Sequence, residues 1–440
     1  MYIIENTNLI PMDAERILSG VDIVINAGKI ASIETHGRTP FDGAMVIDGR
    51  DRYVMPSLTD CHVHCISPED FRWYVSYGVT TVCNYMGTAK ALRWRKELAE
   101  GQRVGPRLIT AGPIIDGTAK FLSVMEYGRT EAQLPLEETY GDLLALDGII
   151  VAEDEATARR AVRYIKEAGY DFVKVYNNLC PEAYYGACDE AEKQGILIVG
   201  HLMDFSNEER LEGKPFSIRQ ASVEHVAGIE DTLMEYLAEH HIALDPTYAV
   251  EKVKLARYEE SPEYQELLAL CPDEEREEWR QCSIRRQEVY KSEPDRRPVE
   301  RKGMAYYHHI MKSFHEKGGL ILAGTDSGID GLLPGADLHL ELGCLSESGI
   351  SNFEVLKTAT VNPAAFFRGD ARLGQALEGS PAELLILAEN PLEDVAAAGK
   401  IEGLIQGDRY YDRAALEAMR QDRRFCIYQD AREQEEVTYD

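Results

Sequence analysis

The chain has 440 residues, of which 44% are hydrophobic, and this is typical of a globular protein with one large and one smaller domain. Its formal net charge of −29 argues against nucleic acids and anionic membrane surfaces as partners. No apolar run approaches the roughly 20 residues that span a bilayer, the N-terminus has no basic region of a signal peptide, and the nine cysteines follow no disulfide spacing. We therefore expect a cytoplasmic protein with reduced thiols.

Short strands are predicted at both ends of the chain. The first 50 residues predict strands over 2–10, 22–25, 31–34 and 45–47, and Asn26-Ala27-Gly28 predicts a tight hairpin because Asn and Gly tolerate positive φ. Apolar runs over 382–387 and 401–406 predict strands again. Strands at both ends predict a small β-sandwich domain assembled from residues 1–52 and 368–440.

The central part of the chain alternates apolar runs rich in Val and Ile with longer helical stretches, such as 153–168, 181–194, 231–239 and 303–317. Near-continuous apolar runs are typical of buried parallel strands, and their alternation with helices predicts βα units of an α/β fold. Eight such units predict a closed (β/α)8 TIM-like barrel over residues 53–367. The eight runs are 53–60, 78–84, 107–111, 171–176, 196–201, 221–225, 242–245 and 320–326.

Two long insertions, 113–148 and 248–301, interrupt the barrel pattern. Each follows the C-terminal end of a strand, where barrel enzymes build lids and substrate pockets. The second is dense in Glu and Arg, so a solvated helical pair is the alternative interpretation.

Histidine, lysine and aspartate side chains stand at the ends of several predicted barrel strands. His62 and His64 end the first strand, and their side chains point the same way because strand side chains alternate between faces. Imidazoles and carboxylates suit zinc and similar divalent ions, and strand ends of a barrel converge on one mouth. Taken singly, each residue has an ordinary alternative, as a core histidine, a strand-end lysine reaching solvent or an aspartate in a turn. The other candidates are Lys174, His201, His225 and Asp326.

Several motifs together resemble the amidohydrolase superfamily, and most closely its imidazolonepropionase-like branch, which includes metal-dependent Xaa-Pro dipeptidases (prolidases). The resemblance implies that His62, His64 and Asp326 hold the more buried of two divalent ions, with zinc the expected metal. It also implies that His201 and His225 hold the second ion, and that Lys174, carrying CO₂ as a carbamate, bridges the two. The motifs include MPSLTDCHVH (55–64), GVTTV (78–82), DFVKVY (171–176), AGTDSG (323–328) and TATVNPA (358–364).

The chain departs from the family pattern at three positions, none of which is a predicted metal ligand. Ser57 stands where the family more often has glycine, and Glu383 replaces a more usual aspartate. Arg368 stands where relatives usually have a small or aliphatic residue.

The ligand set predicts hydrolysis, because divalent ions lower the pKa of bound water from about 15.7 towards about 7 and so supply hydroxide at neutral pH. Asp326 is the expected proton acceptor and later donor to the leaving nitrogen. Tyr176 shares the strand face of Lys174, and we expect it to donate a hydrogen bond to the oxyanion, although a packing role is the alternative. His339 and Tyr248 are weaker candidates for substrate contacts, and Arg368 is weaker still.

The predicted function is cleavage of a C–N amide bond in a small substrate, with an Xaa-Pro or related dipeptide or an N-acyl amino acid expected. One alternative is a cyclic-amide hydrolase or a deaminase of the same superfamily, although deaminases of this type lack a bridging lysine. A non-catalytic binding relative is the other alternative. The sequence leaves the substrate, the metal and the subunit number open, with a homo-oligomer among the alternatives.

Overall fold

The computed structural model describes residues 1–38, 43–65, 67–117, 140, 143, 145–146, 148–203, 217–226, 228–255, 265, 269, 273, 276–277, 279–281, 284, 303–328 and 331–421. Most of the two insertions, 113–148 and 248–301, lies outside these residues, so their roles stay predictions.

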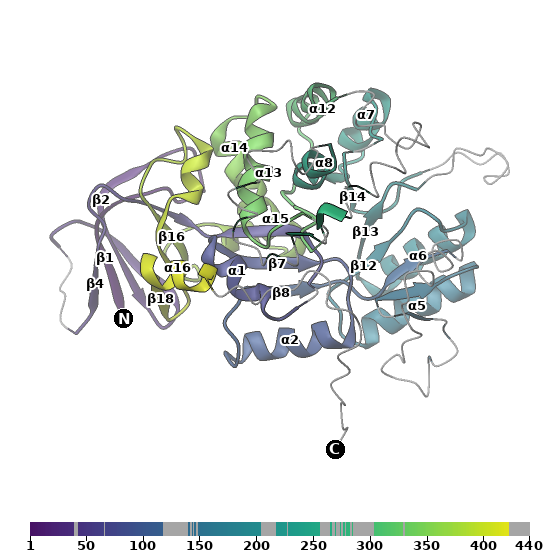
Figure 1. Ribbon diagram of the computed structural model, residues 1–440, viewed down its shortest axis with the longest axis horizontal. Coiled ribbons are helices and arrows are strands. Elements are labelled where there is room, and N and C mark those ends of the chain that lie inside the picture. Colours follow the sequence, from purple (N-terminus) through teal and green to yellow (C-terminus); the bar gives the residue numbers. More distant parts are fainter. Residues whose placement is uncertain are drawn as a thin grey trace, which may run out of the picture.

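Strands from both ends of the chain form one mixed eight-stranded sheet, in the order β18-β17-β16-β5-β1-β2-β3, with β4 paired to β1. In Figure 1 the purple N-terminal strands lie beside the yellow C-terminal ones. Hydrogen bonding joins these strands into a single sheet, where a sandwich would show two. The strands are β1 (Tyr2–Leu9), β2 (Leu18–Asn26), β3 (Lys29–Thr35), β4 (Met45–Asp48), β5 (Tyr53–Pro56), β16 (Glu383–Leu387), β17 (Ile401–Gln406) and β18 (Arg409–Asp412).

The predicted hairpin is present between β2 and β3. Asn26 pairs with Lys29, and the two residues between them, Ala27 and Gly28, have φ of 48° and 70°. Positive φ at both central residues matches the right-handed twist of the flanking strands, which is why such turns favour two-residue loops.

The remaining strands form two sheets in which all pairs are parallel except β10–β11, with the orders β6-β7-β8 and β10-β11-β9-β12-β13-β14-β15. Isolated parallel bridges connect Ala111 to Phe172, Leu244 to Ile321, and Val63 to Ser327. The strands are β6 (Leu58–Val63), β7 (Val79–Asn84), β8 (Arg107–Thr110), β9 (Ile114–Asp116), β10 (Ala145–Leu146), β11 (Ile149–Val151), β12 (Phe172–Val175), β13 (Leu197–His201), β14 (Ser222–Glu224) and β15 (Ala243–Asp245).

Two of the eight predicted barrel strands need correction. The run 53–60 is two strands, because Tyr53–Pro56 pairs with β1 and β16 of the end sheet and the parallel strand β6 begins at Leu58. The run 320–326 makes isolated bridges and no regular ladder. A continuous apolar run does not reveal where the chain changes pairing partners, and this explains the first difference.

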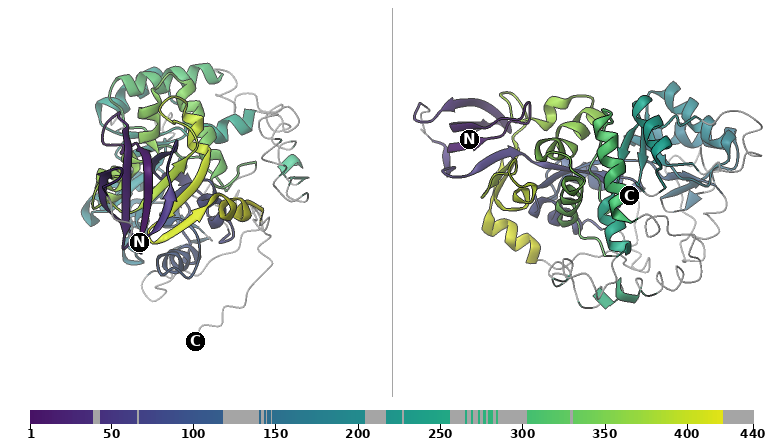
Figure 2. Two further views of the ribbon diagram at one scale, coloured as in Figure 1. Left: turned by 90° about the vertical axis from the view of Figure 1, so that its left-hand side faces the viewer. Right: turned by 90° about the horizontal axis from the view of Figure 1, so that it is seen from above.

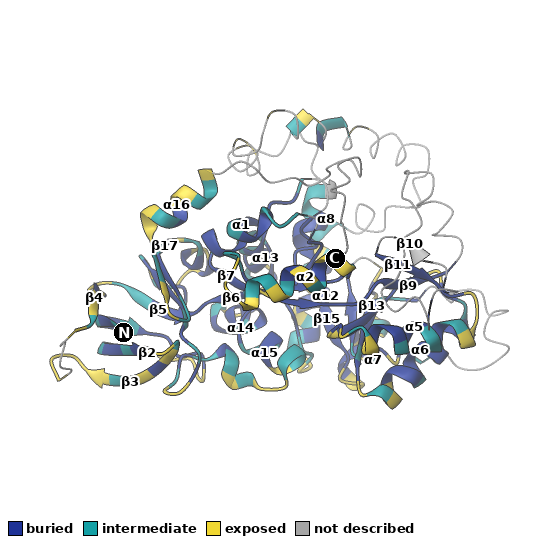
Figure 3. Ribbon diagram, turned by 90° about the horizontal axis from the view of Figure 1, so that it is seen from below, coloured by how far each residue is buried: buried dark blue, intermediate teal, exposed yellow. Residues whose placement is uncertain are grey.

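Helices pack around the parallel strands and bury their apolar faces. The helix α5 (Glu155–Glu167) begins where Asp154 accepts a hydrogen bond from the Thr157 amide, and α6 (Pro181–Gln194) begins with proline and ends at Gly195, whose φ is 58°. Figure 3 shows dark blue, buried strands within a layer of partly exposed helices. Among the described residues, no helix has the length and hydrophobicity needed to cross a bilayer.

The end sheet and the helices α5 and α6 lie at opposite ends of the molecule, as the right-hand view of Figure 2 shows. The other helices are α1 (Asp70–Ser76), α2 (Ala89–Ala99), α7 (Asp231–Glu239), α8 (Tyr248–Leu255), α12 (Met304–Glu316), α13 (Ala336–Glu347), α14 (Asn352–Thr358), α15 (Val361–Arg368) and α16 (Arg413–Gln421), with the short helices η4 (Ala371–Gly374) and η5 (Val395–Gly399).

Candidate metal centre

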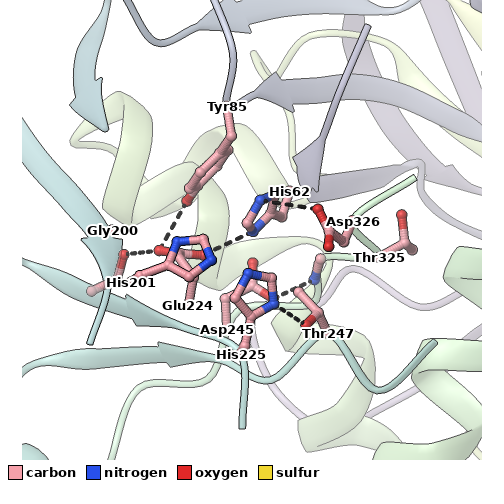
Figure 4. Close-up of polar contacts among 12 residues, drawn as sticks. His62, Tyr85, Gly200, His201, Glu224, His225, Asp245, Thr247, Thr325 and Asp326 are labelled. Carbon is pink, nitrogen blue, oxygen red and sulfur yellow. Dashed lines mark hydrogen bonds and ion pairs between the residues drawn. The ribbon is translucent and has the colours of Figure 1, made fainter. Parts of the chain in front are cut away.

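Three of the predicted ligands converge at the C-terminal end of β6. The Asp326 Oδ1 atom lies 3.4 Å from Nε2 of His62 and 3.0 Å from Nε2 of His64. Both imidazoles and the carboxylate are almost fully buried, and Figure 4 shows His62 and Asp326 pointing toward each other. Asp326 has a φ of 62°, a conformation that aspartate tolerates better than most residues. Three donor atoms this close together match the requirements of a divalent ion.

The second histidine pair lies directly beside the first. His201 is the last residue of β13 and His225 follows β14, and their ring centroids are 4.5 Å apart. The His225 ring lies 5.2 Å from that of His62. Nδ1 of His225 lies 2.7 Å from the Thr247 hydroxyl oxygen, a contact that orients the ring and leaves Nε2 for a metal ion.

Lys174 lies on β12 and is completely buried. Its Nζ atom has no hydrogen-bond partner among the described residues and lies 4.7 Å from the ring centroid of Tyr85 and 5.5 Å from that of Tyr176. Burial lowers the pKa of this amine to about 8, although the nearby carboxylates of Glu224, Asp326 and Asp245 favour the charged form. An accessible neutral form is what capture of CO₂ requires, so this buried amine fits the bridging carbamate that the resemblance implies.

Glu224 orients His62 from behind. Its Oε2 atom accepts a hydrogen bond from Nδ1 of His62 at 3.1 Å, and its Oε1 atom accepts from Ser222 Oγ at 2.6 Å and from the Tyr85 hydroxyl at 3.3 Å. The Tyr85 ring also stacks on His62, with centroids 3.9 Å apart. These contacts hold His62 with Nε2 facing Asp326, which is the arrangement of a metal-bound histidine oriented by a carboxylate.

Two further buried carboxylates support the loop that carries Asp326. Oδ1 of Asp245 accepts from the Gly324 amide at 3.0 Å, while Oδ2 is buried without a hydrogen-bond partner among the described residues. Asp60 accepts from the amide and the hydroxyl of Thr325, at 3.1 and 2.8 Å. Burial raises the pKa of Asp60 to about 7, and burial together with the charge of Glu224 raises that of Asp245 well above its usual range.

The balance of buried charge fits a divalent cation. Among the described residues Lys174 is the one lysine or arginine that is buried, whereas three buried carboxyl groups, those of Glu224, Asp326 and Asp245, interact with it. Burial opposes ionisation of Asp326, but the hydrogen bond with His64 and the charges of His62 and His225 outweigh it and hold the pKa of Asp326 below its usual range. Buried charges need a partner, and a divalent ion at the histidines supplies one.

The structure does not bring every predicted substrate contact to this centre. Tyr176 lies within it, and its ring stacks on His201 with centroids 4.1 Å apart. His339, on α13, instead donates from Nε2 to the Tyr77 carbonyl at 2.9 Å. Tyr248 begins α8 and is fully buried in the main hydrophobic core, where its ring packs against apolar side chains. Arg368 lies at the end of α15, away from the ligands.

Sequence reasoning missed Glu224, Asp245, Asp60 and Tyr85. Asp245 is the last residue of a predicted strand, so the rule that selected the metal ligands also selects it. Glu224 precedes His225, and regular alternation would put the two side chains on opposite faces. The left-handed backbone at His225, with a φ of 69°, breaks this alternation and allows both to reach the centre.

Comparisons with known proteins agree with this geometry. The model of the amidohydrolase family matches residues 53–409. The ochratoxinase of Aspergillus niger is 24% identical over 88% of this chain and 81% of its own length, and a dihydroorotase of Anaeromyxobacter sp. (strain K) is 28% identical over 34% of this chain and 37% of its own. The crystal structure of a Xaa-Pro dipeptidase with bound methionine superposes with a TM-score of 0.67 at 21% identity, over 93% of this chain and 99% of that one. The chain belongs to the amidohydrolase family and is a hydrolase that acts on C–N bonds.

Proposed function

We propose that this protein is a metal-dependent hydrolase that cleaves the amide bond of a small substrate carrying a free carboxylate, such as an Xaa-Pro dipeptide or an N-acyl amino acid. The observation that carries the metal dependence is the convergence of His62, His64 and Asp326 beside a buried Lys174 that lacks a hydrogen-bond partner. The similarity to an ochratoxinase over most of the chain and the fold shared with a Xaa-Pro dipeptidase support the substrate class.

We assign two divalent ions to the centre, with zinc the expected metal, and these ions supply Lewis acidity and a water of lowered pKa. His62, His64 and Asp326 would hold one ion, His201 and His225 would hold the other, and Lys174 as a carbamate would be a ligand of both. Asp326 stays ionised at neutral pH, so it accepts the proton of the attacking water and returns it to the leaving nitrogen.

The residues around the ligands fix their orientation and exclude water. Glu224 accepts a hydrogen bond from Nδ1 of His62, so the proton stays on Nδ1 and the lone pair of Nε2 faces the metal position. Tyr176 lies against His201 and near Lys174, and we assign its hydroxyl to the developing oxyanion.

We further propose that the parallel strands close into a (β/α)8 barrel, with the isolated bridges at Ala111, Leu244 and Val63 joining the edges of the two sheets and the eighth segment. We propose the division into a barrel and a composite end domain that the sequence predicts, but with the first boundary moved from residue 52 to Pro56, because β5 pairs with β1 and β16. The cytoplasmic location and a homo-oligomeric state stay predictions.

Cyclic-amide hydrolysis is the second candidate. It is supported by the similarity of 34% of the chain to a dihydroorotase, whose name denotes a cyclic substrate. The two are separated by assaying metal-loaded protein against dipeptides, N-acyl amino acids and small lactams. We expect turnover of a substrate with a free carboxylate, dependent on added metal. Hydrolysis of neutral lactams with no turnover of any dipeptide or N-acyl amino acid would favour the second candidate.

Glu15→Gln is a matched control for variants of the centre in this assay. Glu15 is exposed in the end sheet region and makes no hydrogen bond or ion pair among the described residues. The control removes one negative charge without touching the ligands, so any loss of turnover specific to Asp326→Asn reports on the centre.

A further inference from the structure

One cavity brings together residues that lie far apart in the sequence. Ser57, Arg368 and Glu383 contribute to it together with Thr80 and Arg107. The cavity is small, with a volume of about 20 Å³ for a water-sized molecule, and it opens to solvent.

This cavity lies at the N-terminal ends of the parallel strands, whereas the metal ligands lie at the C-terminal ends. Ser57 precedes β6, Thr80 is the second residue of β7, and Arg107 begins β8. Arg368 ends α15, and Glu383 begins β16 of the end sheet. The cavity is therefore a separate site at the junction between the parallel strands and the end sheet.

Two arginines share the cavity, Arg107 exposed and Arg368 partly buried, and the single carboxyl group of the lining, Glu383, interacts with both. Among the described residues, the guanidinium groups of Arg107 and Arg368 make no hydrogen bond and no ion pair. Arg368 is partly buried, and burial followed by the charge of Arg107 lowers its pKa. Two neighbouring cations in a partly enclosed space repel each other unless an anion lies between them.

Glu383 neutralises this pair only in part, because one carboxyl group faces two guanidinium groups. It is the one carboxyl group that lines the cavity, and its Oε2 atom is buried without a hydrogen-bond partner among the described residues. Burial raises the pKa of Glu383 to about 7, so a substantial part of it carries a proton at neutral pH. Near it, the hydroxyls of Ser57 and Thr80 lie 2.5 Å apart. The lining thus sets the donors of two guanidinium groups against one carboxyl group that is only partly ionised.

We propose that this cavity binds a small oxyanion, a phosphate or a carboxylate group, between Arg107 and Arg368. Guanidinium groups present paired N–H donors that match the oxygens of phosphate and carboxylate. Because Arg107 begins β8 and Arg368 ends α15, the bound anion connects a parallel strand to this helix and stabilises their contact. The proposal is independent of the reaction at the metal centre.

The test is the thermal unfolding midpoint and calorimetric titration of the full chain with inorganic phosphate, sulfate or malonate, against chloride at equal ionic strength. Saturable binding with a raised midpoint is expected for at least one of these anions, because a ligand of the folded state alone stabilises it. Stronger binding of phosphate and sulfate identifies a tetrahedral anion as the ligand, and stronger binding of malonate identifies a carboxylate.

Variants locate the binding. Arg368→Gln should weaken it by about tenfold or more, since it removes a charge-assisted pair of hydrogen bonds, and Arg368→Lys should weaken it less. Glu383→Gln should strengthen it by removing the competing negative charge. Arg50→Gln is the control, because Arg50 is exposed on the end sheet region and pairs with Asp48. Equal affinities in the wild type, Arg368→Gln and Arg107→Gln, or no saturable binding of any of the three anions, would overturn the proposal.

Discussion

Replacement of Glu224 should weaken metal binding although Glu224 is not a predicted ligand. Its carboxylate accepts three hydrogen bonds, from His62 Nδ1, Ser222 Oγ and the Tyr85 hydroxyl. Glu224→Gln keeps one acceptor oxygen for His62 but replaces a charge-assisted hydrogen bond by a neutral one, a loss of about 1–1.5 kcal/mol that corresponds to about tenfold in affinity. Glu224→Ala removes all three contacts and frees the His62 ring to rotate, so we expect the affinity for zinc to fall by up to about 100-fold.

The assay is competition for zinc between the protein and a chelator of known affinity, with circular dichroism to establish that each variant is folded. Glu15→Gln serves as the control of equal charge, and its affinity should equal that of the wild type. If Glu224→Ala binds zinc as tightly as the wild type, His62 does not depend on this carboxylate, and the orientation argument fails.

Three further predictions follow from other buried groups. Lys174→Ala should lose activity, and a short carboxylic acid should restore part of it by occupying the vacated position between the ions; full activity without the acid would make the lysine structural. Asp326→Asn should lower kcat by at least about 100-fold because it removes the proton acceptor, and stability should change little because asparagine also tolerates the φ of 62°. Steady-state kinetics and thermal unfolding measure these two effects. Unchanged turnover would remove Asp326 from the mechanism. Burial raises the pKa of Glu341 from 4.5 to about 8, so the folded state binds this proton more tightly than the unfolded state. The contribution of the protonated carboxyl group to the free energy of unfolding is therefore complete below pH 4.5 and is lost as the pH rises towards 8. Glu341→Gln should remove this loss, which at about 1.36 kcal/mol per unit is at most about 4–5 kcal/mol, and identical pH dependence of urea unfolding in both proteins would contradict it.

The sequence predicts helices well where end signals are local. The helix 181–194 has its predicted bounds because Pro181 begins it and Gly195 ends it in the left-handed conformation. The grouping of the candidate metal ligands is predictable for a similar reason, since they lie at or near the ends of apolar runs, and parallel strands carry their ends to one edge.

The remaining features depend on packing that a single sequence does not encode locally. Whether His339 and Tyr248 face a substrate is set by how α13 and α8 pack, and the structure places both in contacts elsewhere. The role of Glu224 depends on the positive φ of His225, which no residue pattern at this position indicates. The grouping of Arg107 with Arg368 depends on the junction of two sheets.

The most direct test of the central claim, a binuclear centre bridged by Lys174, is the metal content of the purified protein. Wild type and Lys174→Ala are each reconstituted with zinc and bicarbonate, freed of excess metal, and analysed by mass spectrometry of the elements. We expect about two ions per chain in the wild type and at most about one in Lys174→Ala. Trace metal in the wild type, or two ions per chain in Lys174→Ala, would contradict it.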